Sequence, residues 1–183
     1  MDDDVLVNVF ALSSYVRSAA VNMKAIHCRV FPNGHPYRKK KSKWYVSKEA
    51  YSSDKYPVYC AGAAYLMRPA VLSSLYDAST HVPFFWVDDV YVTGFLAEYA
   101  NVSLVDISSF FGLYVVKRIY AVGNTTLFIH TGAPNKLSRQ RQRLWQSVIR
   151  GRASVDDDFK WKVKRYTRKP EALSVAPPTE RAT

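Results

Sequence analysis

The chain has 183 residues, 48% hydrophobic and 22% charged, so it is long enough to bury a core and too apolar for wholesale disorder. Its formal net charge of +11 permits binding to polyanions, nucleotide-sugar phosphates or an acidic membrane surface. The best candidate for a membrane span, residues 102–116, is shorter than the ~18 residues required and carries Asp106, and no signal peptide is recognisable.

Three carboxylates open the chain. Asp2, Asp3 and Asp4 precede the apolar residues 5–10, which predict a strand buried on both faces. Hard oxygen donors at the end of a strand are the ligands that Mg²⁺ or Mn²⁺ prefers beside a phosphate. A solvated terminus or a helix-capping cluster is the simpler interpretation, so a metal site needs support from the rest of the chain.

The segments that follow mix strand and helix patterns without an internal repeat, which predicts an α/β fold. The expected elements are a helix at 11–25, a strand at 26–31, a turn at 32–34, a basic loop at 37–43, extended segments at 44–46 and 58–67, a helix starting at Pro69, extended segments at 103–107, 113–116 and 126–130, and a basic helix at 135–149. The helix from Pro69 is expected to bury Val71, Leu72, Leu75 and Tyr76. From Gly151 onward the composition turns polar, so residues 151–183 are expected to form a flexible tail.

A second acidic pair, Asp88 and Asp89, follows the apolar and aromatic residues 82–87. Desolvation at such a position raises the pKa of a carboxyl group, which suits a general base. Capping of a helix that runs to Tyr99 would explain one aspartate but not both. The β-branched residues and Gly94 make that helix poor by propensity, so tertiary context must impose it.

Small residues at 61–64, flanked by aromatic residues, would let a backbone or a ligand approach closely. For most of the flanking rings, packing in a core is an equally good interpretation. Cys28 and Cys60 are either two buried thiols or one disulfide. Two N-glycosylation sequons, at Asn101 and Asn124, slightly favour an oxidising secretory lumen and with it the disulfide.

Four blocks of the sequence, in order, are DDDVLVN, KWYVS, YPVYCAGAAYLM and VDDVYVTGFLAEY. Together they closely resemble the C-terminal half of glycosyltransferase family 31, the β-1,3-galactosyltransferases and β-1,3-N-acetylglucosaminyltransferases. The resemblance covers Asp2 to roughly Trp145. The sequence departs from the family pattern at Asp88, where glutamate is usual, at the pair Ala63 and Ala64, and at Thr93, which looks inserted and is expected to tilt the acceptor side.

The resemblance implies a GT-A type fold, N-terminally truncated, with residues 1–150 as its C-terminal part. It implies that Asp4 ligates Mn²⁺ or Mg²⁺ and that His130 is a second metal ligand, although a lone histidine is as often structural. Asp89 would be the general base and Asp88 would assist it. The residues implied to hold or shape the UDP-sugar site are Asp2, Asp3, Trp44, Tyr59 and Gly62.

The implied function is an inverting, metal-dependent transfer of galactose or N-acetylglucosamine, from UDP-galactose or UDP-N-acetylglucosamine, to a glycan hydroxyl on protein or lipid. The implied place is the lumenal side of the Golgi membrane, reached through an anchor and first strands that this chain is expected to lack. Nucleic acid is not an expected partner. Two alternatives stay open: a catalytically inactive lumenal glycan-binding fragment, and a basic nucleic-acid-binding module using residues 38–43 and the late basic helix.

Overall fold

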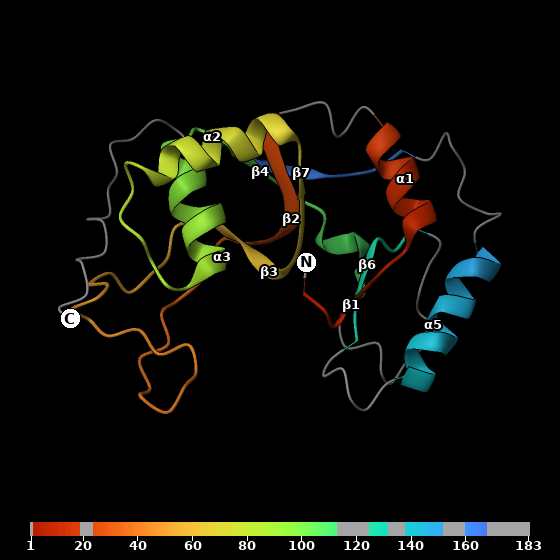
Figure 1. The fold of residues 1–183 in the computed structure, drawn as a ribbon, viewed down its shortest axis with the longest axis horizontal. Helices are drawn as coiled ribbons and strands as arrows, with labels where there is room; N and C mark the ends of the chain where they lie inside the picture. The colour runs from red at the N-terminus through yellow and green to blue at the C-terminus, as the bar shows by residue number, and fades with distance from the viewer. Residues whose placement is uncertain (1, 19–23, 113–124, 132–137, 152–159, 168–183) are drawn as a thin grey trace. The chain divides into compact units, whose positions relative to one another are not determined.

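The computed structural model describes residues 2–18, 24–112, 125–131, 138–151 and 160–167 (Figure 1). The chain forms two compact units. Unit 1 comprises Met1–Met23 and Ile107–Lys164, and unit 2 comprises Lys24–Asp106 and Arg165–Thr183. Both contain helices and mixed sheets, so the α/β prediction is confirmed at this level.

Unit 1 is built on a three-stranded sheet of order β1-β6-β5. Its elements are β1 (Val5–Val7), α1 (Val9–Arg17), the 3-10 turn η3 (Ser108–Phe110), β5 (Phe111–Gly112), β6 (Phe128–His130) and α5 (Ser138–Gly151). Strand β6 pairs antiparallel with β1 and parallel with β5. In this register Val5 lies opposite His130, so the start of β1 meets the end of β6.

The first strand is shorter than its apolar sequence predicts. It ends at Val7, because the Asn8 side chain accepts a hydrogen bond from the Ala11 backbone N–H at 3.1 Å and caps α1. All three residues of β1 are half-buried, so the expectation of a strand buried on both faces over residues 5–10 is wrong. Helix α1 accordingly starts earlier than predicted, at Val9. It also ends earlier than the predicted residue 25, at Arg17, where the Ser18 N–H closes its last turn.

Two apolar clusters are seen among the described residues of unit 1. Buried Ile129 of β6 packs with Leu144 and Val148 of α5, and these two residues are spaced so that they share one face of the helix. The second cluster is aromatic: the ring of Trp161 lies 5.0 Å from that of Tyr15 and 4.9 Å from that of Phe110. Each such side chain, once buried, stabilises the fold by roughly 1.5–3 kcal/mol.

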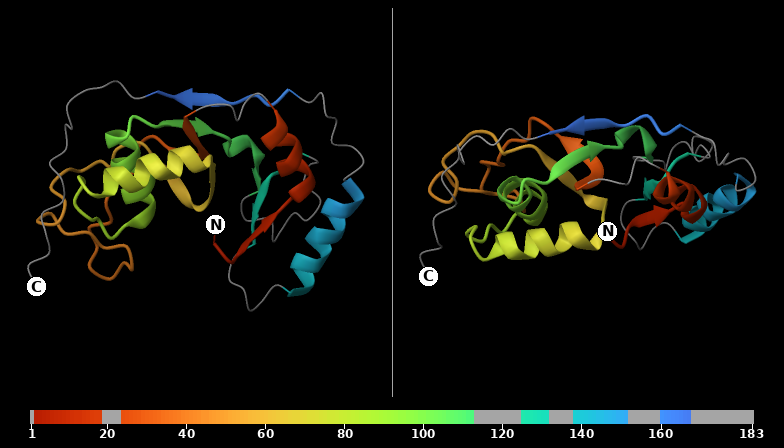
Figure 2. Two further views of the ribbon diagram at one scale, coloured as in Figure 1. Left: turned by 45° about the horizontal axis from the view of Figure 1, so that its top comes forward. Right: turned by 90° about the horizontal axis from the view of Figure 1, so that it is seen from above.

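Unit 2 is a four-stranded sheet of order β3-β2-β4-β7 covered by helices. Its elements are β2 (Ala25–Phe31), β3 (Tyr59–Met67), α2 (Pro69–Ser79), α3 (Asp88–Val90), the π-helix η2 (Tyr91–Leu96), α4 (Ala97–Tyr99), β4 (Ser103–Asp106) and β7 (Lys164–Tyr166). Strand β2 pairs antiparallel with β3 and parallel with β4. Helix α2 lies beside the helix that begins with α3 (Figures 1 and 2), and the core includes Ile26, Leu104, Val71, Leu75 and Phe95.

Helix α2 begins at Pro69 as predicted, because proline has no N–H to lose at the first helical position. Its buried residues are Val71, Leu75 and Ala78, which lie on one face. Leu72 and Tyr76 are 59% and 74% exposed, so the prediction that they are buried is wrong. They form the neighbouring stripe of the helix, which turns away from the core.

The acidic pair begins a continuous helical segment from Asp88 to Tyr99, so the helix supposed by the capping alternative does form, although its residues have low helix propensity. Its middle turns, η2, have π-helical winding. The segment ends in a Schellman motif, in which Asn101 adopts a φ of 50° and the Val102 N–H donates to the Ala97 carbonyl at 2.8 Å. Burial in the core stabilises this helix despite its low propensity. The buried residues are Thr93, Gly94, Phe95 and Leu96.

The basic loop at 37–43 contains one arginine with a structural role. The Arg38 guanidinium donates to four backbone carbonyls at 2.6–2.9 Å, those of Val46, Ser47, Tyr51 and Ser53. This charge therefore organises the loop. The predicted extended segment at 44–46 forms only an isolated bridge, between Tyr37 and Tyr45.

The C-terminal region is described only in part. Within the segment predicted to be a polar tail, residues 151–183, strand β7 forms the edge of the unit 2 sheet and Tyr166 packs against its core. The expected strand at 113–116 and residues 135–137 of the predicted basic helix lie outside the described residues. Among the described helices, none is both long enough and apolar enough to cross a membrane.

Candidate active site

In unit 1, Asp4 and His130 lie side by side. The His130 Nε2 atom is 3.0 Å from the Asp4 Oδ2 atom, and both side chains are about three-quarters buried, with exposures of 25% and 21%. The antiparallel pairing of β1 with β6 produces this contact, since it sets Val5 opposite His130. Asp2 and Asp3 are exposed at the turn that precedes β1.

Two residues that the sequence did not single out hold the Asp4 backbone. The Thr131 N–H and hydroxyl donate to the Asp4 carbonyl at 2.8 and 2.7 Å. Arg141 of α5 donates from Nε to the Thr131 hydroxyl at 3.1 Å and from Nη2 to the Asp3 carbonyl at 3.2 Å. Arg141 is one of several arginines in a basic helix, and no local pattern distinguishes it from its neighbours.

Asp4 and His130 are suitable ligands for a divalent cation whose other coordination positions are filled by the substrate. The Asp4 Oδ1 atom is buried and has no hydrogen-bond partner in the described part of the chain, which leaves an oxygen ligand in place. No group of three or more acidic, histidine or cysteine residues converges among the described residues. Two protein ligands are enough for Mg²⁺ or Mn²⁺ where substrate phosphates and water supply the others.

In unit 2, the acidic pair occupies the first turn of α3. The residue at the N-cap position is Val87, which makes no side-chain capping bond, so capping does not account for either aspartate. Asp88 is exposed and Asp89 is half-buried. The Asp89 Oδ1 atom accepts a hydrogen bond from the Val90 N–H at 2.9 Å.

Burial raises the pKa of Asp89 above its ordinary value, and the neighbouring Asp88 charge adds to that effect. The backbone N–H groups of Val90 and Gly62 oppose it, because they stabilise the charged form. The result is a carboxylate that is a stronger base than an exposed aspartate. A group that must take a proton from a hydroxyl needs this property.

Gly62 lies next to Asp89 because the pairing of β3 with β2 shifts register here, forming a bulge. Cys28 of β2 pairs with Tyr65 and Val30 pairs with Cys60, so residues 61–64 of β3 lie opposite the single residue Arg29. A Cβ atom added to Gly62 would lie 3.5 Å from the Asp89 Cβ atom and 3.6 Å from Oδ2. Because position 62 is glycine, no side chain from this position contacts the carboxyl group.

Tyr59 also belongs to this neighbourhood. Burial, and then the negative charge of Asp89, raise the pKa of Tyr59 to about 12. Its ring packs against those of Phe31 and Tyr56, and a Cβ atom at Gly34 would overlap it, so a larger residue at position 34 would displace the ring. Trp44 is 49% exposed, and its ring contacts Tyr37 and the Lys43 ammonium group.

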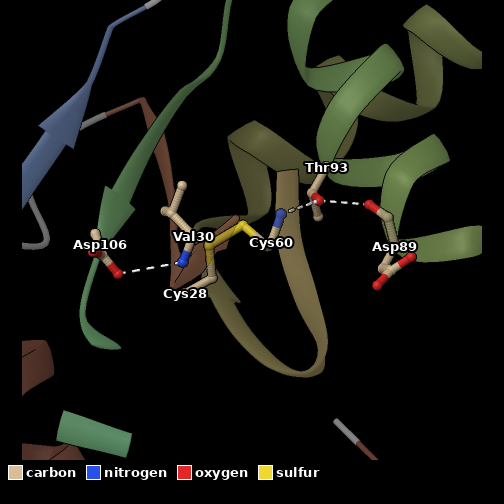
Figure 3. The surroundings of a disulfide bond; sticks show 6 residues. All are labelled: Cys28, Val30, Cys60, Asp89, Thr93 and Asp106. Atoms are coloured by element: carbon tan, nitrogen blue, oxygen red, sulfur yellow. Dashed lines mark hydrogen bonds between the residues drawn. A yellow bond between two sulfur atoms is a disulfide. The ribbon is translucent and has the colours of Figure 1, made fainter. Parts of the chain in front are cut away.

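Cys28 and Cys60 form a disulfide with a Cα–Cα distance of 5.7 Å (Figure 3). The pairing expected of an oxidising compartment is confirmed over the alternative of two free thiols. The bond joins β2 to β3 across the register shift, at the first residue before the bulge. It thereby fixes one end of the segment that carries Gly62.

A sequence model of the family described as Galactosyltransferase matches residues 1–108, more than half of the chain. The chain therefore belongs to this galactosyltransferase family, glycosyltransferase family 31. The matched span contains Asp4 and Asp89, whereas His130 and Arg141 lie beyond it.

Individual relatives are β-1,3-glycosyltransferases by name. β-1,3-Galactosyltransferase 5 of Mus musculus is 34% identical over 97 residues, which are 53% of this chain and 32% of that protein. β-1,3-Galactosyltransferase brn of Drosophila melanogaster is 46% identical over 69 residues, 38% of this chain and 21% of the relative. Lactosylceramide 1,3-N-acetyl-beta-D-glucosaminyltransferase A of Xenopus laevis is 38% identical over 93 residues, 50% of this chain and 25% of the relative. The chain thus spans between about a fifth and a third of the length of these relatives.

Proposed function

We propose that the chain carries the metal-binding and base-bearing parts of an inverting β-1,3-hexosyltransferase with a GT-A type fold. Its donor is UDP-galactose or UDP-N-acetylglucosamine, and its acceptor is a glycan hydroxyl on protein or lipid. The observation that carries the proposal is the environment of Asp89. This half-buried carboxylate has a raised pKa and lies beside Gly62, which has no side chain to contact it, in a chain of the galactosyltransferase family.

In the proposed reaction Asp89 takes the proton of the acceptor hydroxyl. The freed oxygen forms a bond to the anomeric carbon of the donor, on the face opposite the diphosphate. The bond from that carbon to the diphosphate oxygen breaks, and UDP leaves with the electron pair. One displacement inverts the configuration, so a single carboxylate base is sufficient. An inverting glycosidase, by contrast, also needs a protonated carboxyl group for its leaving oxygen.

Asp4 and His130 would hold Mn²⁺ or Mg²⁺ in this scheme. The bound cation supplies neutralisation of the charge that develops on the departing diphosphate. Supporting this assignment are the 3.0 Å contact between the two side chains and the buried, unpartnered Asp4 Oδ1 atom. Thr131 and Arg141 would keep the Asp4 backbone in register with β6.

The names of the relatives include both galactosyl and N-acetylglucosaminyl transfer, and they support a β-1,3 linkage with either donor. We also propose the Golgi lumen as the compartment. The disulfide supports an oxidising environment, because such bonds persist outside the reducing cytosol.

Two measurements on the full chain test the proposal. Calorimetric titration with UDP in the presence of Mn²⁺ should show binding that Asp4→Ala abolishes and that Asp77→Ala, a control at an exposed acid, leaves intact. Transfer from the two UDP-sugars should fall by about 10² to 10⁴ in Asp89→Asn and by less in Asp88→Asn. Unchanged UDP affinity in Asp4→Ala would refute the metal assignment, and the opposite order of the two asparagine variants would refute the choice of base.

A further inference from the structure

A fully buried hydroxyl connects the strand that bears the disulfide to the helix that bears Asp89. Thr93 is 0% exposed. Its Oγ1 atom accepts a hydrogen bond from the Cys60 N–H at 2.8 Å and donates one to the Asp89 carbonyl at 2.6 Å (Figure 3). One side chain thus satisfies a buried donor on β3 and an acceptor in the first turn of α3.

The strand side of this connection is bonded to the neighbouring strands. Cys60 is bonded covalently to Cys28 of β2, and it pairs with Val30 at the last register position before the bulge. The Val30 N–H in turn donates to the Asp106 carboxylate of β4 at 3.3 Å (Figure 3). Three neighbouring strands therefore fix the Cys60 N–H to which Thr93 is hydrogen-bonded.

The helix side is the part that needs support. A threonine hydroxyl that bonds the carbonyl four residues earlier tends to bend a helix, and here it does so where α3 passes into the π-helical turns of η2. The carbonyl concerned belongs to Asp89 itself. The backbone position of this residue decides whether its carboxylate meets the Gly62 and Val90 N–H groups.

We propose that Thr93 is a positioning residue for the Asp89 carboxylate, acting as a strut from the disulfide-linked strand to the first turn of the helix. The inference rests on the proposed role of Asp89 as the base. It states how that role is supported: the hydroxyl of Thr93 keeps Asp89 in its half-buried position beside Gly62. Thr93 does not contact substrate in this scheme.

The hydroxyl can be separated from the size of the side chain by substitution. Thr93→Val keeps the shape and removes both hydrogen bonds, whereas Thr93→Ser keeps both bonds and loses only a methyl group. Thr93→Ala removes the hydroxyl without a β-branched side chain and serves as a second hydroxyl-free variant. If Thr93→Val does not yield folded protein, the comparison of Ala with Ser carries the same test.

Two readouts distinguish positioning from a merely structural role. In the full chain, NMR titration of the Asp89 carboxyl carbon should show a pKa nearer the ordinary aspartate value in the Val and Ala variants, with the native value retained in Ser. In transfer assays kcat should fall about 10- to 100-fold in Val and Ala, as for a misplaced catalytic group, with the donor KM unchanged and with recovery in Ser.

The proposal is overturned if Thr93→Val or Thr93→Ala lowers the melting temperature while the Asp89 titration and kcat stay native. It is also overturned if Ser behaves like Ala. Failure of the proposed function gives a different result: Asp89→Asn would then retain transfer. The NMR titration of Asp89 would still report whether Thr93 positions it.

Discussion

At the scale of single residues, the surroundings of Asp89 make its carboxylate more basic and make the folded chain less stable. Burial raises its pKa, so the folded chain binds this proton more tightly than the unfolded chain does. Ionisation of Asp89 therefore lowers the stability of the fold as pH rises from 3.8, the ordinary pKa of aspartate, through the raised pKa of the folded state. Functional groups often carry such a cost, and it can be measured.

We expect Asp89→Asn to melt at a higher temperature than the native chain at neutral pH, because asparagine keeps an acceptor for the Val90 N–H without a buried charge. The difference should close as pH falls below about 4, where the native carboxyl group is also neutral in both states. Thermal unfolding followed by circular dichroism over this pH range measures the effect. Asp88→Asn, at an exposed position, should show no comparable gain; a lower melting temperature for Asp89→Asn at neutral pH would contradict the interpretation.

Arg141 supports Asp4 through geometry as well as charge, since its guanidinium reaches the Thr131 hydroxyl and the Asp3 carbonyl together. Lysine keeps the charge but lacks the planar fork. Arg141→Lys should therefore weaken Mn²⁺-dependent UDP binding by roughly 10- to 100-fold, the usual effect of losing a supporting contact around a metal ligand. Titration calorimetry tests this with Arg143→Lys, exposed on the same helix, as the control. Equal affinities for the two variants would mean that Arg141 acts only by charge or not at all.

At the scale of elements, the central feature is the bulge in β3. Ordinary pairing would keep residues 61–64 in the ladder, but here they leave it and Gly62 reaches Asp89. The disulfide on one side of the bulge and the Thr93 hydroxyl on the helix limit how far this segment can move. The bulge and the first turn of α3 are therefore held together.

Removing the disulfide should make this part of unit 2 less stable. Replacing both cysteines by alanine frees a loop whose ends are separated by 32 residues, and we expect a loss of about 2–4 kcal/mol in the free energy of unfolding. Denaturant titration of the native chain and the double variant measures this loss. Mass spectrometry after alkylation without reductant should find neither cysteine labelled in the native chain, and labelling of both would show that the bond is absent in solution.

At the scale of the whole molecule, the chain divides into two compact units, and the described residues of each include an apolar cluster. The tryptophans are divided between them, with Trp44 and Trp86 in unit 2 and Trp145 and Trp161 in unit 1. Trp86 packs against the unit 2 core, and Trp161 lies in the aromatic cluster of unit 1. These two side chains can therefore report on each unit independently.

We expect unfolding to deviate from a single two-state transition. Variants that keep either Trp86 or Trp161 as the only tryptophan should give different midpoints in guanidinium chloride. Reduction with dithiothreitol should lower the Trp86 midpoint, because both cysteines belong to unit 2, and leave the Trp161 midpoint in place. Coincident midpoints that shift together on reduction would mean that the chain unfolds as one cooperative body.

The sequence alone determined the features that depend on neighbours along the chain. The apolar runs located β2, β3, β4 and β6, Pro69 located the start of α2, and the four ordered blocks led to the family. Asp89 could be selected because an acidic pair after an aromatic run cannot be explained by capping alone. The limit of local patterns is visible at residues 5–10, where five apolar residues predict a strand but the capping side chain of Asn8 ends it at Val7.

Tertiary structure decided what depends on residues far apart in the sequence. Strand pairing brings His130 to Asp4, and only the folded chain distinguishes Arg141 from the other arginines of its helix. The bulge that carries Gly62 to Asp89 arises from the register between two strands, and the choice between thiols and a disulfide follows from the same pairing. The physical reason is that register and burial are set by the packing of whole strands and helices, which no short stretch of sequence contains.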